Sequence, residues 1–256
     1  MPNAALFLQI LTLTSAGLAA LRLFVNGLFR RYPALFSYLI VRVVFGVTPL
    51  FLNHSDDLYE QIYILSQPIT WACYILMVRE LYALVLTTHR GLATVGRWAM
   101  YISVVVSIAL SVLSILPKIT PKMPQTSKWI GYIFAIDRGV NLALVLFILL
   151  ILFFLSRYPV RLSSNVVRHA AFLFTYFLSN TAGILLRTIY GPSIMSDQIS
   201  LALAGVATLM ILAWLFLITP AGEEVRKVTG IASEHEERIL QQLESLNAAM
   251  LKISRS

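Results

Sequence analysis

Residues 129–155 read WIGYIFAIDRGVNLALVLFILLILFFL, an apolar run interrupted by one acidic and one basic side chain, Asp137 and Arg138. An α-helix needs about 20 mostly apolar residues to cross the hydrocarbon core of a bilayer, which is about 30 Å thick. The run exceeds that length, so it predicts a transmembrane helix with charged groups deep in the membrane.

Six further runs of similar character flank this one. The chain is 58% hydrophobic with a mean hydropathy of +0.79, and only 12% of its residues are charged, whereas a soluble domain carries about 25%. These values exclude a soluble fold, and lipid offers no partner to an open strand edge. We therefore expect an all-α fold, a polytopic membrane bundle of seven transmembrane helices over residues 5–29, 34–53, 61–86, 98–116, 129–155, 167–190 and 198–219.

The loops of the predicted bundle differ in charge between its two sides. One side is poor in basic residues, with three lysines between residues 117 and 128. Since cytoplasmic loops carry the excess of Lys and Arg, we predict an N-terminus outside a bacterial inner membrane and a cytoplasmic C-terminus. This distribution accounts for the net charge of +8 and offers no basic stripe to nucleic acid. The basic side holds Arg30, Arg31, Arg90, Arg97, Arg157, Arg161, Arg168, Arg226 and Lys227.

The sequence changes character at Pro220, which divides a bundle, residues 1–219, from a cytoplasmic tail, residues 220–256. Ser233 followed by Glu236 is a capping-box signature for an amphipathic helix over about 233–253. An apolar stripe follows at spacings of four and three residues, and the polar face is acidic. This pattern favours self-association or docking to a cytoplasmic partner over lying on anionic lipid. The predicted partner-binding residues are Ile239, Leu243, Leu246 and Met250.

Counting about 1.5 Å per helical residue places Arg42, Asp137 and Arg138 near the middle of the membrane. Charged groups are costly there unless they are paired or hydrated. Asp137 is the one acid at this depth, so one of the two arginines lacks a counter-charge and is expected to bind an anion. We expect a pocket that accepts a carboxylate, a phosphate or a lipid headgroup, near the helix kink that Pro68 predicts. Its ligand-binding residues are Arg42, Gln67, Asp137, Arg138, Asn141 and Asn180.

The same charges have a structural interpretation as ion pairs that hold the bundle together, and this alternative stays open for the pocket residues. Three other arginines lie nearer the membrane surfaces, where long side chains reach the headgroups. The predicted structural ion-pair residues are Arg22, Arg79 and Glu80 toward the cytoplasm, and Glu60 and Arg187 toward the outside.

Several function classes are excluded by residues that the sequence lacks. Every lysine lies outside the predicted helices, so no retinal Schiff base can form inside the bundle. The single cysteine, Cys73, and the dispersed histidines form no metal-binding pattern. No metalloprotease, nucleophile-elbow or phosphate-loop motif occurs. We therefore expect no cofactor, no metal and no enzymatic activity.

Two stretches, LFRRYPALFSYLI at residues 28–40 and RELYALVLTTHRGLATVGRW at residues 79–98, precede a short charged tail. Taken together, they resemble an uncharacterised bacterial family of seven-transmembrane-helix integral membrane proteins. The resemblance spans nearly the whole chain and implies the seven-helix topology. It implies no activity, ligand or catalytic residue.

Two function classes fit these features. A compact bundle without an attached enzyme, followed by an acidic amphipathic helix, favours a sensory or scaffold protein that takes a small anionic or lipidic ligand and couples to a partner. The motif Arg-Tyr-Pro occurs at residues 31–33 and again at 157–159, which favours two parallel three-helix repeats around a central helix. Small-solute transporters use such a 3+1+3 plan, and this is the alternative function.

Overall fold

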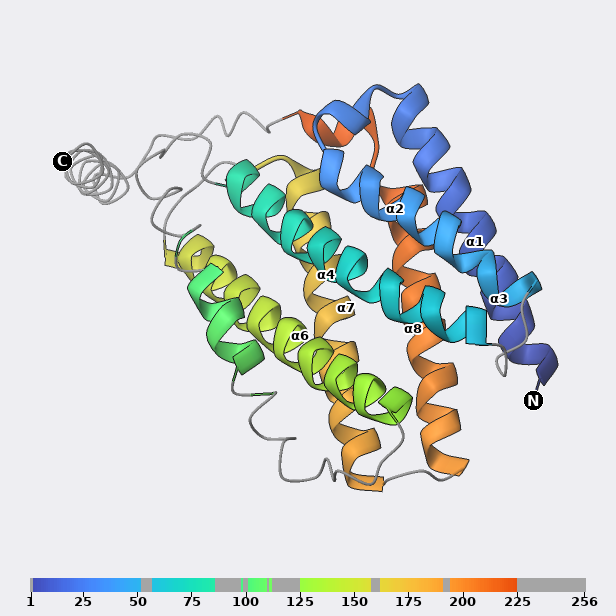
Figure 1. The fold of residues 1–256 in the computed structure, drawn as a ribbon. Coiled ribbons are helices and arrows are strands. Elements are labelled where there is room, and N and C mark those ends of the chain that lie inside the picture. Colours follow the sequence, from blue (N-terminus) through green and yellow to red (C-terminus); the bar gives the residue numbers. More distant parts are fainter. Residues whose placement is uncertain are drawn as a thin grey trace.

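The computed structural model describes residues 2–51, 57–85, 98, 101–109, 111, 125–157, 162–190 and 194–224. This part of the chain is helical apart from short turns and contains no strand, which confirms the predicted all-α class. The long helices form a bundle (Figure 1). Their bounds are α1 Pro2–Val25, α2 Pro33–Gly46, α3 Thr48–Phe51, α4 Asp57–Val85, α6 Gln125–Arg157, α7 Ser164–Tyr190 and α8 Ile194–Leu217, with 3-10 turns η1 at Leu28–Arg30 and η3 at Pro220–Glu223.

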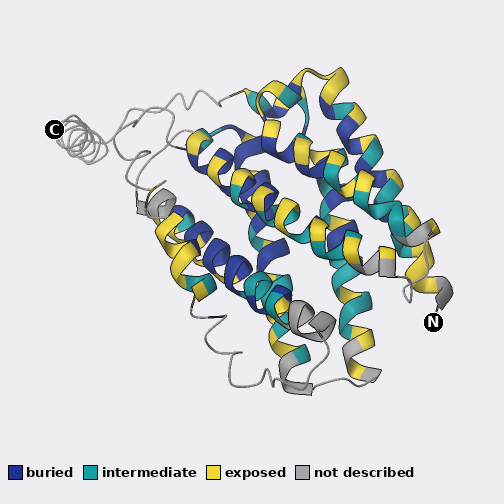
Figure 2. Ribbon diagram, in the orientation of Figure 1, coloured by how far each residue is buried: buried dark blue, intermediate teal, exposed yellow. Residues whose placement is uncertain are grey.

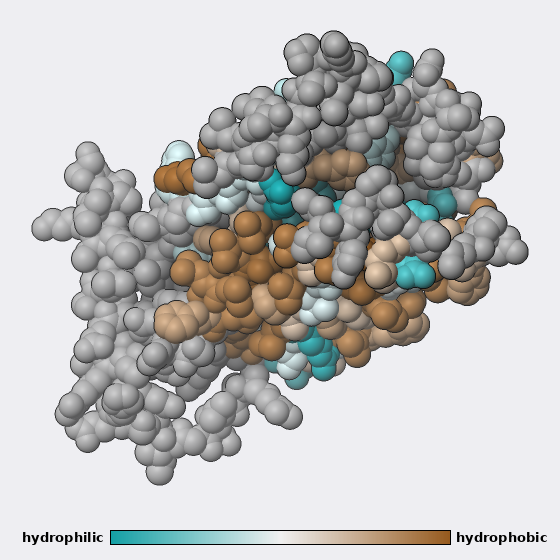
Figure 3. Space-filling model, turned by 90° about the horizontal axis from the view of Figure 1, so that it is seen from below, coloured by the Kyte–Doolittle hydropathy of each residue, from teal (hydrophilic) through white to brown (hydrophobic). Residues whose placement is uncertain are grey.

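Five of these helices are long and apolar enough to cross a bilayer, and α2 is a shorter apolar helix. Buried residues face the inside of the bundle and exposed residues face outward (Figure 2). The outward faces carry many leucine, phenylalanine and valine side chains, which form a broad hydrophobic surface (Figure 3). Such a surface marks an aggregation hazard in water, whereas it fits a membrane-embedded protein. The spans are Ala4–Val25, Gln61–Val85, Tyr132–Phe153, Ser164–Arg187 and Asp197–Leu217.

The backbone explains why two helices end earlier than predicted. α1 ends at Val25 rather than near residue 29, because Gly27 adopts a φ of 68°, a left-handed conformation that glycine accepts most readily. α2 ends at Gly46 rather than near residue 53, because Pro49 has no N–H for the carbonyl of Phe45 and starts a new helix, α3. The predicted tail helix over 233–253 lies outside the described residues.

The helices form a ring in which each packs against the next in the order α1, α2, α4, α6, α7 and α8, and α8 packs against α1 again. α4 also contacts α7 across the ring. Large buried side chains such as Leu144 and Phe177 fill the interior. Glu80 on α4 stabilises the start of α2, because its Oε2 accepts a 2.6 Å hydrogen bond from the Ala34 N–H, as a helix-capping carboxylate does.

Residues 101–109 form a helix that lies against α6 (Figure 1). A Cβ atom placed on Gly139 of α6 would lie 2.8 Å from the Ser107 carbonyl oxygen and 2.9 Å from Ile108 Cα. The two backbones therefore cross at a distance that only glycine permits, as in the small-residue contacts of other transmembrane helices. Gly139 thus positions the 101–109 helix on the bundle.

Candidate functional site

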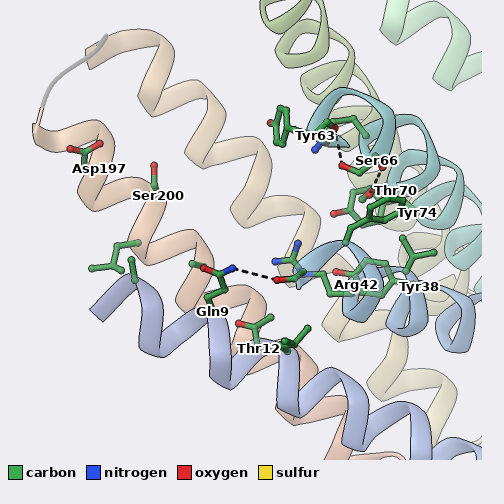
Figure 4. A pocket seen from close by; sticks show the side chains of 18 of the residues that line it. Gln9, Thr12, Tyr38, Arg42, Tyr63, Ser66, Thr70, Tyr74, Asp197 and Ser200 are labelled. Carbon is green, nitrogen blue, oxygen red and sulfur yellow. Dashed lines mark hydrogen bonds between the residues drawn. The ribbon is translucent and has the colours of Figure 1, made fainter. Parts of the chain in front are cut away.

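A cavity of about 670 Å³ lies between α1, α2, α4 and α8, in the half of the bundle where α1, α4 and α8 begin. Side chains from these helices surround it (Figure 4). Its volume is within the range of small-ligand pockets, roughly 300–1,000 Å³. Apolar groups such as Phe45 and Leu201 form part of the wall, and the polar part includes Gln9, Thr12, Arg42, Ser66, Gln67 and Thr70.

Two interhelical hydrogen bonds show which residues of α1, α2 and α8 lie at the same level of the bundle. The Gln9 amide donates to the Gly46 carbonyl over 3.4 Å, and the hydroxyl oxygens of Thr12 and Thr208 lie 2.5 Å apart. Because α2 runs antiparallel to α1, Arg42 lies about 6 Å, one helical turn, further from the start of α1 than Gln9 does. Arg42 therefore projects into the cavity at depth (Figure 4).

Arg42 has no counter-charge in the part of the chain that the structure describes. No described carboxylate lies within ion-pair distance of it, and its guanidinium makes no hydrogen bond there. Asp197 also lines the cavity, but it precedes Thr208 by about 16 Å along α8 and lies at the far end of the site (Figure 4). The phenols of Tyr38, Tyr74 and Tyr176 lie near Arg42, and they supply no counter-charge because phenols are neutral at neutral pH.

The structure brings two of the six predicted ligand-binding residues to this cavity, Arg42 and Gln67. The other four do not line it. Arg138 on α6 donates to the Ser111 carbonyl over 3.4 Å, and Asn180 is half-buried on α7. The order of the helices in the ring explains why the α6 residues do not reach the cavity. α4 lies between α2, which carries Arg42, and α6, which carries Asp137, Arg138 and Asn141.

Asp137 and Asn141 form a second polar contact instead, on the α4 and α6 interface. Asp137 Oδ1 accepts hydrogen bonds of 3.0 Å from Trp71 Nε1 and from Asn141 Nδ2. The charge of Arg187 acts on Asp137 as well, while the Arg187 guanidinium hydrogen-bonds across to α8. The side chain of Glu60, the predicted partner of Arg187, lies outside the described residues.

The three residues predicted to form ion pairs toward the cytoplasm have other partners in the structure. The Arg22 guanidinium donates to the Leu215 carbonyl. Arg79 donates to the Tyr101 hydroxyl over 3.5 Å, whereas Glu80 caps α2. The ion-pair prediction is therefore corrected for this group. Adjacent residues point about 100° apart on a helix, so Arg79 and Glu80 meet different neighbours.

The polar face of α4 was not predicted from the sequence. Tyr63, Ser66, Thr70 and Tyr74 line the cavity together with Gln67. They recur at spacings of three and four residues, which places them on one side of a helix. Polar residues at this spacing inside an apolar segment were the signal that pointed to the cavity wall.

A second polar cluster, the Glu223 junction, consists of Arg31, Tyr32, Asn165 and Glu223 and lies where α8 gives way to η3. Glu223 Oε1 accepts 2.6 Å hydrogen bonds from the Tyr32 hydroxyl and from Asn165 Nδ2, and Oε2 lies 2.5 Å from Arg31 Nε. Burial, and after it the hydrogen bond to Glu223, raise the pKa of the Tyr32 hydroxyl well above its usual value. Tyr32 therefore remains a hydrogen-bond donor at neutral pH.

An aromatic column, formed by Tyr74, Tyr38, Trp214, His169 and Tyr32, connects the cavity with the Glu223 junction. Successive ring centroids are 5.7, 6.1, 6.0 and 5.6 Å apart, which is the range of favourable aromatic contacts. All of these side chains are buried. The column begins at the cavity wall and ends at the residue that donates to Glu223.

Known proteins give no guide to what the cavity binds, so its ligand has to be inferred from the residues that line it. No protein-family model, no curated protein and no solved structure matches this chain. Within the described residues, no group of three or more His, Cys, Asp or Glu side chains is placed to hold a metal ion. Arg42, which has no carboxylate partner among the described residues, is the strongest chemical feature of the cavity.

Proposed function

We propose that this protein is a sensory or scaffold protein of the inner membrane that binds a small organic anion in the cavity. It has seven transmembrane helices with the N-terminus outside, and its tail helix binds a cytoplasmic partner or a second copy of the chain. The observation that carries the proposal is that Arg42 lines the cavity without a described carboxylate partner.

An unpaired guanidinium at this depth favours an anionic ligand. Arginine stays charged in proteins, and the exposed Arg42 side chain faces the cavity, where it can take a counter-charge and hydrogen bonds from a ligand. A carboxylate supplies both, because its two oxygens accept charge-assisted hydrogen bonds from the planar guanidinium. Gln67 lines the same cavity and adds an amide donor. A single positive charge beside apolar walls suits a monocarboxylate with a short carbon chain.

The position of the cavity supports a ligand that arrives from outside. The cavity lies where α1, α4 and α8 begin, and in the predicted orientation these ends face away from the arginine-rich loops. The Glu223 junction lies at the other end, next to the tail. Ligand and tail are therefore on opposite sides of the membrane in the proposed topology.

The aromatic column supports a sensory role over a purely passive one. A ligand that contacts Tyr38 or Tyr74 shifts rings that pack, one on the next, as far as Tyr32. Tyr32 donates to Glu223, one residue before the described chain ends. Packed side chains of this kind transmit a shift when the element at their end has two arrangements. The Glu223 junction is the element that we assign to that role.

Replacing Arg42 with glutamine tests the anion site. We expect Arg42→Gln to weaken hexanoate binding by on the order of tenfold to hundredfold, the equivalent of one hydrogen bond between charged groups. The measurement is the thermal unfolding of the detergent-purified protein as hexanoate is titrated. Ligand at about 100 times its dissociation constant stabilises the folded state by about 2.7 kcal/mol, so the rise in Tm is measurable.

Arg79→Gln is the matched control, because it removes the same charge outside the cavity. It should leave hexanoate protection unchanged. Neutral 1-hexanol, which has the same carbon chain, separates anion binding from partition into the detergent micelle. Equal protection of the parent protein and Arg42→Gln by hexanoate, or protection by 1-hexanol alone, contradicts the proposed site.

One observation favours the alternative function, a small-solute transporter. α2 lies between α1 and α4 in the ring, and α7 lies between α6 and α8, so the two halves of the chain form similar three-helix rows, as a 3+1+3 carrier has. Vesicles that contain the purified protein discriminate the two functions. A carrier accumulates a labelled, membrane-impermeant carboxylate such as gluconate, whereas a sensor binds the ligand without uptake.

A further inference from the structure

The hydroxyl groups on the α4 wall of the cavity donate their hydrogen atoms to backbone carbonyl groups of the helix. Ser66 Oγ donates to the Tyr63 carbonyl and Thr70 Oγ1 donates to the Ser66 carbonyl, each over 2.8 Å (Figure 4). A hydroxyl group has a single hydrogen but two lone pairs. Both oxygens therefore offer the cavity acceptors and no donor.

Arg42 and Gln67 present hydrogen-bond donors to a ligand in the cavity. Within the described residues neither side chain has a hydrogen-bond partner, and both line the cavity. Gln67 is adjacent to Ser66, and Thr70 lies one turn further along α4, so the amide donor and the two hydroxyl acceptors share one wall. A ligand that satisfies this wall and Arg42 needs an anionic acceptor group and hydrogen-bond donors in the same molecule.

The arrangement of charge favours hydroxyl donors over an ammonium group. A ligand ammonium beside Ser66 and Thr70 would need a nearby carboxylate from the protein. Asp197 is the acid that lines the cavity among the described residues, and it lies at the far end of the site (Figure 4). A neutral hydroxyl needs only the acceptor oxygens that the wall presents.

We propose that the cavity selects hydroxylated carboxylates of the sugar-acid class over plain carboxylates of the same chain length. This inference rests on the proposed function, in which Arg42 binds the carboxylate. It adds that Ser66 and Thr70 accept hydrogen bonds from hydroxyl groups of the ligand. Sites built to hydrogen-bond a ligand hydroxyl discriminate strongly against the analogue that lacks it.

Gluconate and hexanoate provide the test, because both have six carbons and one carboxylate and they differ in hydroxyl groups. We expect gluconate to bind at least about tenfold more tightly than hexanoate, since each hydrogen bond contributes roughly threefold to tenfold. In the double variant Ser66→Ala/Thr70→Val the affinity for gluconate should fall by about tenfold while that for hexanoate is unchanged. Thermal protection of the purified full-length protein measures all four affinities, and the single variant Ser66→Ala replaces the double variant if the latter does not fold.

Thr175→Val is the matched control, because the Thr175 hydroxyl makes the same kind of backbone hydrogen bond, to the Ala171 carbonyl over 2.9 Å, on an exposed face of α7. It should bind gluconate as the parent protein does. Hexanoate binding that equals gluconate binding and depends on Arg42 overturns the selectivity but leaves the anion site in place. If neither carboxylate binds in an Arg42-dependent manner, the proposed function fails as well.

Discussion

Gly139→Ala should lower the free energy of unfolding by about 3 kcal/mol, the upper end of the usual cost of overpacking. The added Cβ would lie 2.8 Å from the Ser107 carbonyl oxygen and 2.9 Å from Ile108 Cα. Both atoms belong to a backbone, so no side-chain rotation relieves the contact. The cost exceeds the gain of about 1 kcal/mol that alanine brings to a helix interior, and the 101–109 helix has to move away from α6.

Gly205→Ala on α8 is the control for this prediction, because a Cβ there meets no atom within 4 Å. That variant should be neutral or more stable by up to about 1 kcal/mol. Denaturant titration of both variants in one detergent gives the comparison. Unfolding curves for Gly139→Ala and Gly205→Ala that coincide would show that the 101–109 helix does not cross α6 at Gly139.

Glu223→Ala should lower the free energy of unfolding by about 3 kcal/mol, since hydrogen bonds to a charged group contribute about 1.5–3 kcal/mol each and Glu223 is partly exposed. The substitution removes the acceptor of Tyr32 and Asn165, both of which are fully buried, and the counter-charge of Arg31. It leaves the Tyr32 hydroxyl buried without that acceptor. The hydrogen bonds and the ion pair that are lost all lie at the Glu223 junction, between α8 and the tail.

Limited proteolysis after Arg226 and Lys227 measures the effect on the tail. In the parent protein we expect saturating gluconate to change the cleavage rate, and in Glu223→Ala we expect fast cleavage with or without the ligand. Glu224→Ala removes an exposed acid next to the junction and should behave as the parent protein. A cleavage rate in Glu223→Ala that still responds to the ligand excludes the junction as the element that couples the cavity to the tail.

The helical class and most of the helix positions could be predicted from the sequence, because hydropathy and length together decide whether a segment crosses lipid. The helix over residues 164–190, for example, was expected over 167–190. The break between α2 and α3 was missed, since hydropathy carries no information about backbone hydrogen bonds. Pro49 was the available signal, because proline removes a donor and begins helices more readily than it continues them.

The candidate site could be predicted only in part, because a sequence gives the depth of a residue but not the order of the helices around the bundle. Depth alone placed Arg42 and Asp137 at one level. The ring separates them, since Asp137 meets Trp71 on the α6 side of α4, whereas Arg42 faces the cavity that α1, α2, α4 and α8 enclose. Depth indicated only that one of the two arginines, Arg42 or Arg138, lacks a counter-charge, and the order of the helices shows why Asp137 does not neutralise Arg42.

The most direct test of the anion site is a crystal structure of the protein with 6-bromohexanoate, whose bromine atom is located by anomalous scattering. We expect one bromine peak per chain inside the cavity between α1, α2, α4 and α8, with the carboxylate hydrogen-bonded to the Arg42 guanidinium, and no such peak in crystals of Arg42→Gln. Bromine found only on the lipid-facing surface of the parent protein, or bound in the cavity with its carboxylate away from Arg42, would exclude the proposed anion site.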